Sequence, residues 1–216
     1  MPGSPTGLTW QEYTRQIFDE PCFNEVYPHL LNDSETRGSR NGKRGMENGR
    51  SREDDLVAAM QWVGGTAVHN EIDNGQIPDI EILGTLFSVK HKSVPHGKWD
   101  ASGMKANWTV DKGSVDKSVD DLQHPADYGI IISLVSPIEV RLYVLGPERY
   151  SKIIRELGNG AFKKPKEKTN ARGVEYSKAA TDRFMAEVEI VHSLSCNLKA
   201  ECPIQRRFQD LQAAGF

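Results

Sequence analysis

The stretch IPDIEILGTLFSVKHK, residues 77–92, places an acid and a base on two neighbouring apolar strands. Alternation puts Asp79 on the polar face of the first strand, and it puts Ser88 and Lys90 on the polar face of the second. A turn near Gly84 folds the two strands into a hairpin, so a carboxylate and an ammonium can meet above a hydrophobic floor. Such a pair suits phosphodiester hydrolysis, because the carboxylate binds a divalent cation while the lysine orients or activates water and neutralises the pentacovalent phosphate.

The hairpin resembles the PD-(D/E)xK nuclease superfamily, and more narrowly its type II restriction endonucleases. Pro78-Asp79 matches the PD, and Ser88-Val89-Lys90 occupies the (D/E)xK position. The run RGSRNGKRGMENGRSREDDL also resembles the Arg/Gly-rich segment before the first helix of many restriction enzymes. The resemblance covers roughly residues 37–146. It implies a restriction-endonuclease-like α/β fold, with a central mixed β-sheet flanked by helices, and Mg²⁺-dependent, sequence-specific cleavage of double-stranded DNA, usually by a homodimer acting on a short palindrome.

The resemblance also implies a role for each residue. Asp79 would ligate the Mg²⁺, and Lys90 would orient or activate the attacking water or shield the charge on the phosphate. Ser88 would fill out the site by binding a water held by the cation. Restriction enzymes often bring an additional acid from the start of the first helix of the core, and here that acid would be Glu53 or Asp54, acting as a metal ligand directly or through water.

The chain departs from the family pattern at Ser88, where the family has an acid. A hydroxyl contributes no charge, and fewer negative ligands bind a cation more weakly, so one catalytic metal per site is favoured over two. Glu81 and Asp100 are further candidates for the missing carboxylate. Glu53 and Asp54 rank ahead of them, because they lie at the helix start that the resemblance supports.

A run of basic residues precedes that helix and is balanced by a single acid, Glu47. Phosphate contacts supply most of the affinity of a protein for nucleic acid, so we interpret these basic residues as DNA-binding. They are Arg37, Arg40, Lys43, Arg44, Arg50 and Arg52. The alternative interpretation is a solvated linker.

A second candidate DNA-binding segment, residues 91–108, follows Lys90 directly and is rich in His, Lys, Asn and Trp. Such side chains can read base edges in the major groove, where Lys suits guanine and Asn suits adenine. The candidates are Lys92, His96, Lys98, Lys105 and Asn107. The alternative is an ordinary loop, and for Trp99 and Trp108 packing on the core is favoured.

Other chemistries have weaker support. His192, Cys196 and Cys202 lie close together, but zinc needs a fourth ligand such as Cys22, and the spacing lacks a CxxC knuckle, so buried cysteines are favoured. The chain has no GxxxxGK[ST] loop, which argues against a nucleoside triphosphate as a partner, and no GxSxG elbow for a serine hydrolase.

Hydrophobic periodicity predicts the elements that position these residues. Thr9 and Glu12 form a capping box ahead of a helix over 10–19, and Ser51 opens a second helix that stops at Gly64-Gly65. The run 32–54 lacks periodicity and is predicted as a loop. Strands are predicted at 66–72, 78–83, 86–91, 127–135 and 138–146, and further helices in the second half of 100–124, at 147–157, at 175–192 and from Pro203. This order predicts a mixed α/β sheet in a single nuclease domain over 1–216, with its core at about 50–157.

The bulk properties agree with a globular enzyme. With 216 residues, 26% charged residues and a formal charge of −3, the chain can bury a core and carries no uniformly basic coat. It has three cysteines, no apolar run of membrane-spanning length and no signal-peptide pattern at its start, so we expect a cytoplasmic protein with no membrane partner. Two alternatives to a restriction enzyme stay open: a repair or branched-DNA nuclease of the same superfamily, and a DNA-binding module that has lost catalysis.

Overall fold

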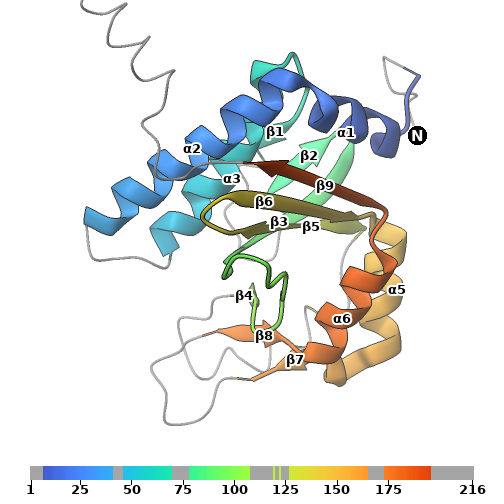
Figure 1. The fold of residues 1–216 in the computed structure, drawn as a ribbon. Coiled ribbons are helices and arrows are strands. Elements are labelled where there is room, and N and C mark those ends of the chain that lie inside the picture. The colour runs from blue at the N-terminus through green and yellow to red at the C-terminus, as the bar shows by residue number, and fades with distance from the viewer. Residues whose placement is uncertain are drawn as a thin grey trace, which may run out of the picture.

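A six-stranded mixed β-sheet forms the centre of the molecule, with the strand order β1-β2-β3-β5-β6-β9 (Figure 1). The computed structural model describes residues 7–40, 46–69, 78–107, 119, 122, 127–164 and 173–195. The strands of this sheet are β1 Val68–His69, β2 Ile80–Ile82, β3 Thr85–Ser93, β5 Tyr128–Val135, β6 Glu139–Leu145 and β9 Ile190–Ser195. Strands β3 and β5 run parallel, and the other neighbours run antiparallel.

Helices cover both faces of this sheet (Figure 1). The helices are α1 Trp10–Asp19, α2 Pro21–Arg40, α3 Met46–Trp62, α5 Pro147–Leu157 and α6 Lys178–Glu187, and a short 3₁₀ helix, η1, spans Gly158–Ala161. Helices α1, α2 and α3 lie on one face, while α5 and α6 lie on the other beside a small sheet of β4 Lys105–Asn107, β8 Val174–Tyr176 and β7 Phe162–Lys163. The predicted architecture, a mixed sheet flanked by helices, is confirmed.

Side chains of the central strands divide between two hydrophobic cores. Strand β5 is buried along its whole length: Ile131 packs with the α1–α3 helices, whereas Ile130 and Ile132 pack with α5 and α6. Strand β3 contributes Phe87 and Val89 to the first core, and from its opposite face only Leu86, near the start of the strand, packs against the second core. From Ser88 onward, the opposite face of β3 is therefore left for polar side chains. The strand predicted at 127–135 is confirmed as β5.

Local signals in the sequence set several boundaries. The Thr9 hydroxyl accepts a hydrogen bond from the Glu12 amide at 3.3 Å, and the Glu12 carboxylate accepts one from the Thr9 amide at 2.9 Å, so the predicted capping box is confirmed. Gly64 follows α3 with a φ of 82°, which stops the helix as predicted. The hairpin turns at Leu83 and Gly84, where Gly84 has a φ of 75°.

The predicted loop over 32–54 is wrong. Helix α2 continues to Arg40 and α3 begins at Met46, so only residues 41–45 fall outside these helices and outside the described residues. The polar residues of this run show no helical stripe, but α2 packs against α3 and buries Leu31 and Leu56 completely. Packing at this one contact overrides the weak helix propensity of the Gly- and Asn-rich segments that flank it.

The predicted helix over 175–192 is only partly confirmed. Helix α6 ends at Glu187, and the chain continues as β9, which pairs with β6 at the edge of the sheet. Phe184 and Val191 lie on one stripe of the predicted helix, but Phe184 is buried, whereas Val191 is 56% exposed because alternation along β9 turns it outward. The helix predicted from Pro203 lies outside the described residues. No helix in the described ranges has the length and apolar content to cross a bilayer.

Gly129 in β5 provides a test of the packing that holds the hairpin against the sheet. A Cβ at this position would collide with the backbone oxygen of Leu145 and would lie 2.7 Å from the ring of Phe87. We expect Gly129→Ala to reduce the free energy of unfolding by about 1–3 kcal/mol, the usual cost of overpacking a core. Urea denaturation measures the change. Gly160→Ala is the matched control, because a Cβ there meets nothing within 4 Å, and equal stability of the two variants would contradict this packing.

Candidate active site

The Asp79 carboxylate is the centre of the site. The antiparallel pairing of Ile80 with Phe87 brings Asp79 beside Ser88 on the neighbouring strand. One oxygen, Oδ2, accepts hydrogen bonds from the Val89 amide at 2.6 Å and from the Ser88 hydroxyl at 2.9 Å. The Lys90 Nζ lies 3.7 Å from the same oxygen. The structure thus brings together all three residues of the predicted hairpin site.

The second oxygen of this carboxylate is open. Across the described ranges, Asp79 Oδ1 accepts no hydrogen bond, and the Asp79 and Lys90 side chains keep 21% and 19% of their surface exposed. A partly buried carboxylate with one oxygen fixed and one available is a suitable ligand for a hard divalent cation, so the donor set fits Mg²⁺. The ammonium beside it suits a negatively charged substrate oxygen.

The other predicted acids are not gathered around this carboxylate. Glu53 is partly buried and Asp54 is exposed near the middle of α3, which packs on the opposite face of the sheet from Lys90. Glu81 lies on the polar face of β2, opposite Leu86. No group of three His, Cys, Asp or Glu side chains close enough to hold a metal ion occurs among the residues that the structure describes.

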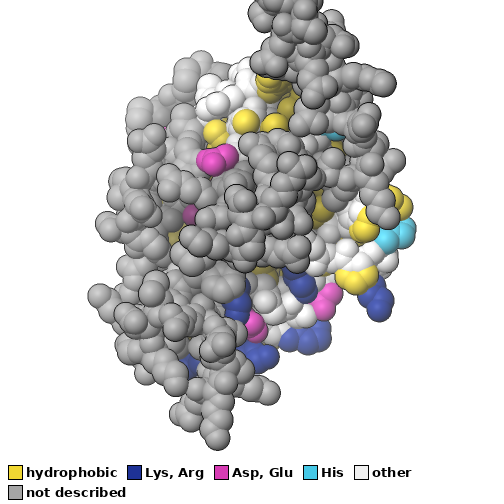
Figure 2. Space-filling model, turned by 90° about the vertical axis from the view of Figure 1, so that its left-hand side faces the viewer, with side chains coloured by type: hydrophobic (Ala, Val, Ile, Leu, Met, Phe, Trp, Pro, Cys, Tyr) yellow, Lys and Arg dark blue, Asp and Glu magenta, His cyan; other side chains and the backbone are white. Residues whose placement is uncertain are grey.

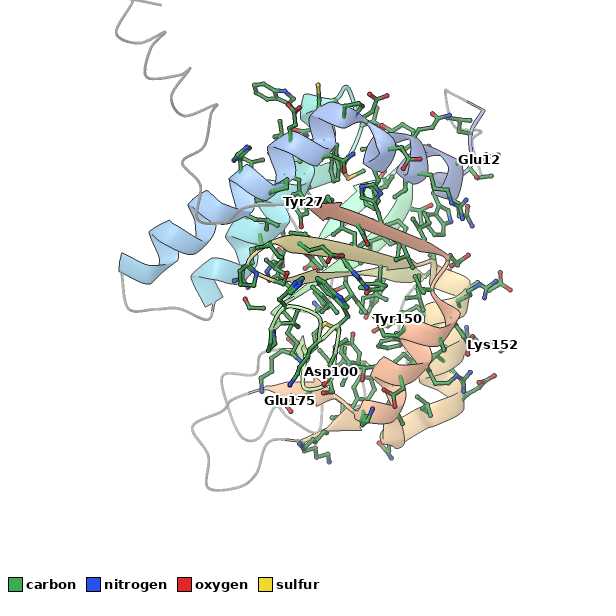
Figure 3. The ribbon with its side chains drawn as sticks, in the orientation of Figure 1. Glu12, Tyr27, Asp100, Tyr150, Lys152 and Glu175 are labelled. Atoms are coloured by element: carbon green, nitrogen blue, oxygen red, sulfur yellow. The ribbon has the colours of Figure 1, made fainter. Side chains whose placement is uncertain are left out.

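Three buried tyrosines, Tyr128, Tyr150 and Tyr176, lie on the same face of the sheet as Lys90, and the sequence reasoning missed them. Figure 3 labels Tyr150, which lies close to α5 and α6. The Tyr150 and Tyr176 hydroxyls are 2.8 Å apart, and the Tyr128 and Tyr150 ring centroids are 5.4 Å apart. Burial raises the pKa of Tyr128 and of Tyr176, and the negative charge of Asp79 raises both further. These phenols therefore stay protonated and form a neutral floor near the carboxylate. In the sequence they occupy apolar stripes, where they are indistinguishable from ordinary core residues.

A second polar cluster lies on the α2–α3 face of the sheet, where Figure 3 labels Tyr27. The Tyr27 hydroxyl is 3.2 Å from Ser133 Oγ, and burial raises the pKa of Tyr27. Burial also lowers the pKa of His91 well below its ordinary value, and the nearby Arg52 charge lowers it further. Arg52, predicted to contact phosphate, is partly buried and acts on His91, a half-buried histidine of β3.

The remaining candidate DNA-binding residues fall in several places. Arg37, Arg40 and Arg50 lie in α2 and α3, with side chains outside the described part of the chain, and Lys43 and Arg44 lie outside it altogether.

The candidates of residues 91–108 are better placed by the structure. Lys92 donates to the carbonyls of Asp100 and Ser102, and the Lys105 Nζ is 2.7 Å from Glu175 Oε1. His96 and Lys98 are exposed, Asn107 is half-buried on β4, and Trp99 packs against the second core as favoured. Figure 2 shows Lys and Arg side chains on the lower part of one face, with Asp or Glu side chains between them. Trp108 lies outside the described residues.

The zinc hypothesis is not tested by the structure, because Cys196 and Cys202 lie outside the described residues. His192 lies on β9 with its Nε2 2.7 Å from Asn24 Oδ1, and its Nδ1 is 3.7 Å from Asp19. Cys22 is exposed on α2.

Comparisons with known proteins agree with this geometry. A solved structure described as "Restriction endonuclease in complex with substrate DNA" has a TM-score of 0.69 and 24% sequence identity, covering 93% of this chain and 99% of that chain. This likeness shows the restriction-endonuclease-like fold. No curated protein matches the chain. A family model described as "Restriction endonuclease ThaI" matches residues 14–209. Restriction endonucleases generally require divalent metal ions and bind DNA. Since the family match spans most of its length, the chain belongs to the ThaI restriction endonuclease family and is a type II, sequence-specific DNA endonuclease.

Proposed function

We propose that this endonuclease hydrolyses phosphodiester bonds at the Asp79–Lys90 pair with Mg²⁺ as its cation. The observation that carries the proposal is the convergence of Ser88, Val89 and Lys90 on one oxygen of Asp79. Mg²⁺ is favoured over softer metals because the residues around this carboxylate offer hydroxyl and carboxylate oxygens rather than thiolate or imidazole. The bound cation would supply positive charge to the phosphate and lower the pKa of a water.

Each residue of the hairpin then has a distinct task. Asp79 presents Oδ1 to the cation while the Val89 amide and the Ser88 hydroxyl hold Oδ2, which fixes the carboxylate before substrate arrives. The Lys90 ammonium orients the attacking water or neutralises the charge that develops on the phosphate. Ser88 contributes orientation without charge.

We expect Asp79→Asn and Lys90→Met to separate these two tasks. The Asn side-chain oxygen can still accept from Val89 and Ser88, so the hairpin keeps its geometry while the charge is lost. Both variants should cleave the recognition sequence about 10³-fold more slowly, because each removes a charge that acts on the transition state. Asp79→Asn should also lose binding of Mg²⁺, and Lys90→Met should keep it, as measured by isothermal titration calorimetry.

Binding of uncleaved duplex DNA is the control in this experiment, since both variants should retain it. Lys152→Met serves as the matched control substitution, because Lys152 lies exposed on α5 and pairs only weakly with Glu156 at 4.0 Å. Cleavage near the normal rate by either site variant would remove that residue from the mechanism.

A second carboxylate from α3 is part of the proposal. The Arg52 charge acts on His91, which follows Lys90 on β3 but points to the α1–α3 face of the sheet, so this part of α3 lies across β3 from the Asp79–Lys90 pair. The neighbouring Glu53 or Asp54 would therefore assist the cation through water. Glu81 is the competing candidate because it shares a strand face with Asp79.

Substitution of each candidate acid by its amide identifies the second carboxylate. We expect Glu53→Gln or Asp54→Asn to raise the Mg²⁺ concentration for half-maximal cleavage by about tenfold, since one negative ligand is removed. Glu81→Gln is the comparison variant and should leave that concentration unchanged. Titration of Mg²⁺ in a plasmid cleavage assay measures this concentration for all three variants. If only Glu81→Gln raises it, the second carboxylate comes from Glu81 on β2.

We also propose that the enzyme acts as a homodimer. The described part of one chain contains one Asp79–Lys90 pair, whereas a double-strand break requires hydrolysis of two phosphodiesters of opposite polarity. A two-fold symmetric dimer places one site on each strand of a palindromic sequence.

A dimer predicts the mass of the enzyme in solution and the form of plasmid DNA that it produces. Sedimentation should give about twice the chain mass of 24.1 kDa, and supercoiled plasmid should become linear without accumulation of nicked circles. A single-chain mass together with nicked circles as the end product would show that the active form is a monomer.

A further inference from the structure

The connection between β3 and β4, residues 94–104, rises directly beyond the active-site strand. We call it the β3–β4 loop. Its base is fixed to the core: the Val94 amide donates to the Val135 carbonyl at 2.8 Å, and Ala101 and Met104 are 2% and 3% exposed. Its four-residue tip, Pro95 to Lys98, is wholly exposed. The loop thus has a base that is fixed to the core and a tip that is exposed to solvent.

The tip itself is a tight turn. The Lys98 amide donates to the Pro95 carbonyl at 3.0 Å, and Gly97 has a φ of 77°, the conformation that glycine supplies at the third position of a type II turn. His96 therefore occupies a corner of the turn and Lys98 follows it. Among the residues that the structure describes, neither side chain has a hydrogen-bond or ion-pair partner, so both are available to a ligand.

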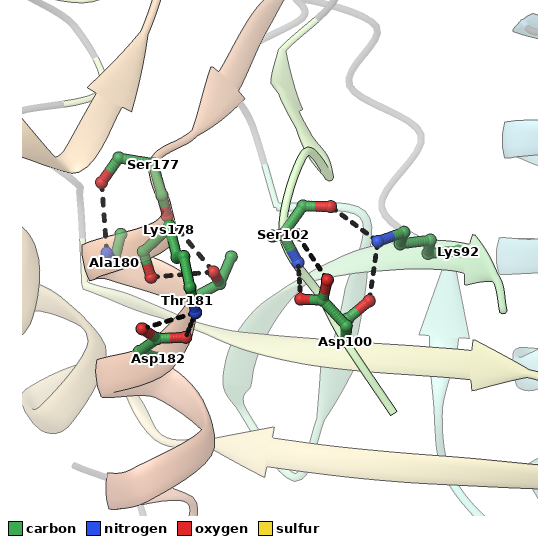
Figure 4. Close-up of polar contacts among 8 residues, drawn as sticks. All are labelled: Lys92, Asp100, Ser102, Ser177, Lys178, Ala180, Thr181 and Asp182. Atoms are coloured by element: carbon green, nitrogen blue, oxygen red, sulfur yellow. Dashed lines mark hydrogen bonds and ion pairs between the residues drawn. The ribbon is translucent and has the colours of Figure 1, made fainter. Parts of the chain in front are cut away.

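Lys92 holds the second half of the loop in place. Its Nζ donates to the carbonyl oxygens of Asp100 at 2.7 Å and Ser102 at 2.6 Å (Figure 4). The Asp100 carboxylate in turn accepts from the Ser102 amide at 2.8 Å and from the Ser102 hydroxyl at 2.6 Å. We call these three residues the Lys92 clamp. Two of the three ammonium donors are used inside the protein, which leaves Lys92 poorly suited to bind a phosphate.

A second contact reinforces the loop. The Arg141 guanidinium lies 4.1 Å from the centre of the Trp99 ring, and the Arg141 Nε donates to Glu139 at 2.6 Å. Trp99 is the residue between the exposed tip and Asp100, so this stacking fixes the point at which the tip leaves the clamp. The loop is thus held from both β3 and β6.

The clamp also connects the loop to the catalytic residues. Ser88, Lys90 and Lys92 alternate along β3 and therefore share one face of the sheet. Lys92 follows Lys90 by two residues, about 7 Å along the strand. A phosphate at the Asp79–Lys90 pair therefore places the neighbouring base pairs within reach of the loop tip.

We propose that the Lys92 clamp is a positioning device which pre-organises the tip of the β3–β4 loop, so that His96 and Lys98 read base edges in the major groove next to the cleaved phosphate. This inference rests on the proposed function. Lys92 is then a positioning residue rather than a DNA contact, and Asp100 serves the loop rather than the cation. A loop ordered before binding loses little entropy in the complex, and its donors can discriminate guanine through N7 and O6.

The test measures discrimination between DNA sequences. The recognition sequence is first identified from the fragment ends of phage DNA cut by the wild-type enzyme. For each variant, kcat/KM is then measured on a duplex with this sequence and on a duplex with one altered base pair, and the ratio is compared with that of the wild type. Because the ratio is taken within each variant, it is independent of which residues perform the chemistry. Failure of the Asp79–Lys90 assignment is therefore distinguishable from failure of this inference.

His96→Ala and Lys98→Ala should each reduce this ratio by about tenfold, the discrimination of one good base contact. Lys92→Met should reduce the kcat/KM ratio similarly, although the tip residues are intact. Lys92→Arg should keep most of the wild-type ratio, because arginine can donate to both carbonyls. Lys152→Met removes the same charge on α5 and should leave the ratio unchanged. Thermal unfolding verifies that each variant is folded, and Ser102→Ala, which removes one contact of the clamp, replaces Lys92→Met if that variant does not fold.

Two results would overturn the inference. If Lys92→Met slows cleavage of both duplexes equally and reduces the salt dependence of binding, Lys92 contacts a phosphate. If the ratio stays at the wild-type value in the His96 and Lys98 variants, the loop tip does not read bases.

Discussion

The hydrogen bond from the Val89 amide to Asp79 is the constraint on which the active site depends. Strand β2 ends its pairing at Ile80, so beyond this point β3 has backbone amides that β2 does not reach. The Asp79 carboxylate takes the place of a backbone acceptor for one of them. Because the donor is a main-chain group, its position follows from the strand register rather than from a side-chain rotamer. The same register sets the spacing between Asp79 and Lys90, and a one-residue slip of β3 would send Lys90 to the opposite face from Asp79.

The two faces of β3 carry different kinds of side chain, apolar on one and mainly polar on the other. Phe87 and Val89 pack with the α1–α3 helices, while Ser88, Lys90 and Lys92 point to the face that carries the tyrosines and the β3–β4 loop. Ser88 and Lys90 both contact Asp79, whereas Lys92 donates to the loop carbonyls of Asp100 and Ser102. One strand therefore aligns the Asp79–Lys90 pair, which we propose is catalytic, with the segment that we propose reads DNA sequence.

Local sequence patterns were sufficient to predict the hairpin, because Asp79, Ser88 and Lys90 are placed by alternation and by a glycine turn within a dozen residues. Local patterns were insufficient where contacts between residues far apart in the sequence determine the secondary structure. Residues 105–107 form a strand only because residues 174–176 pair with them, and no local pattern indicates that pairing. The spacing of Ala180, Phe184, Val188 and Val191 is helical throughout, yet the last of these lies in β9, since pairing with β6 is available there. Tyr128, Tyr150 and Tyr176 resembled core residues, and the proximity of Tyr128 and Tyr176 to Asp79 emerges only from the fold.

The substitution of an acid by Ser88 changes the electrostatics of the empty site. Two adjacent carboxylates would repel a DNA phosphate until a cation neutralised them, which imposes an order of assembly: metal first, then nucleic acid. The Asp79–Lys90 pair has no net charge, and the hydroxyl of Ser88 adds none. A phosphate can approach such a pair without a prior neutralising ion. Under the proposed function, the cation and the DNA can therefore bind the Asp79–Lys90 pair in either order, and the metal-free enzyme can search along DNA before the cation binds.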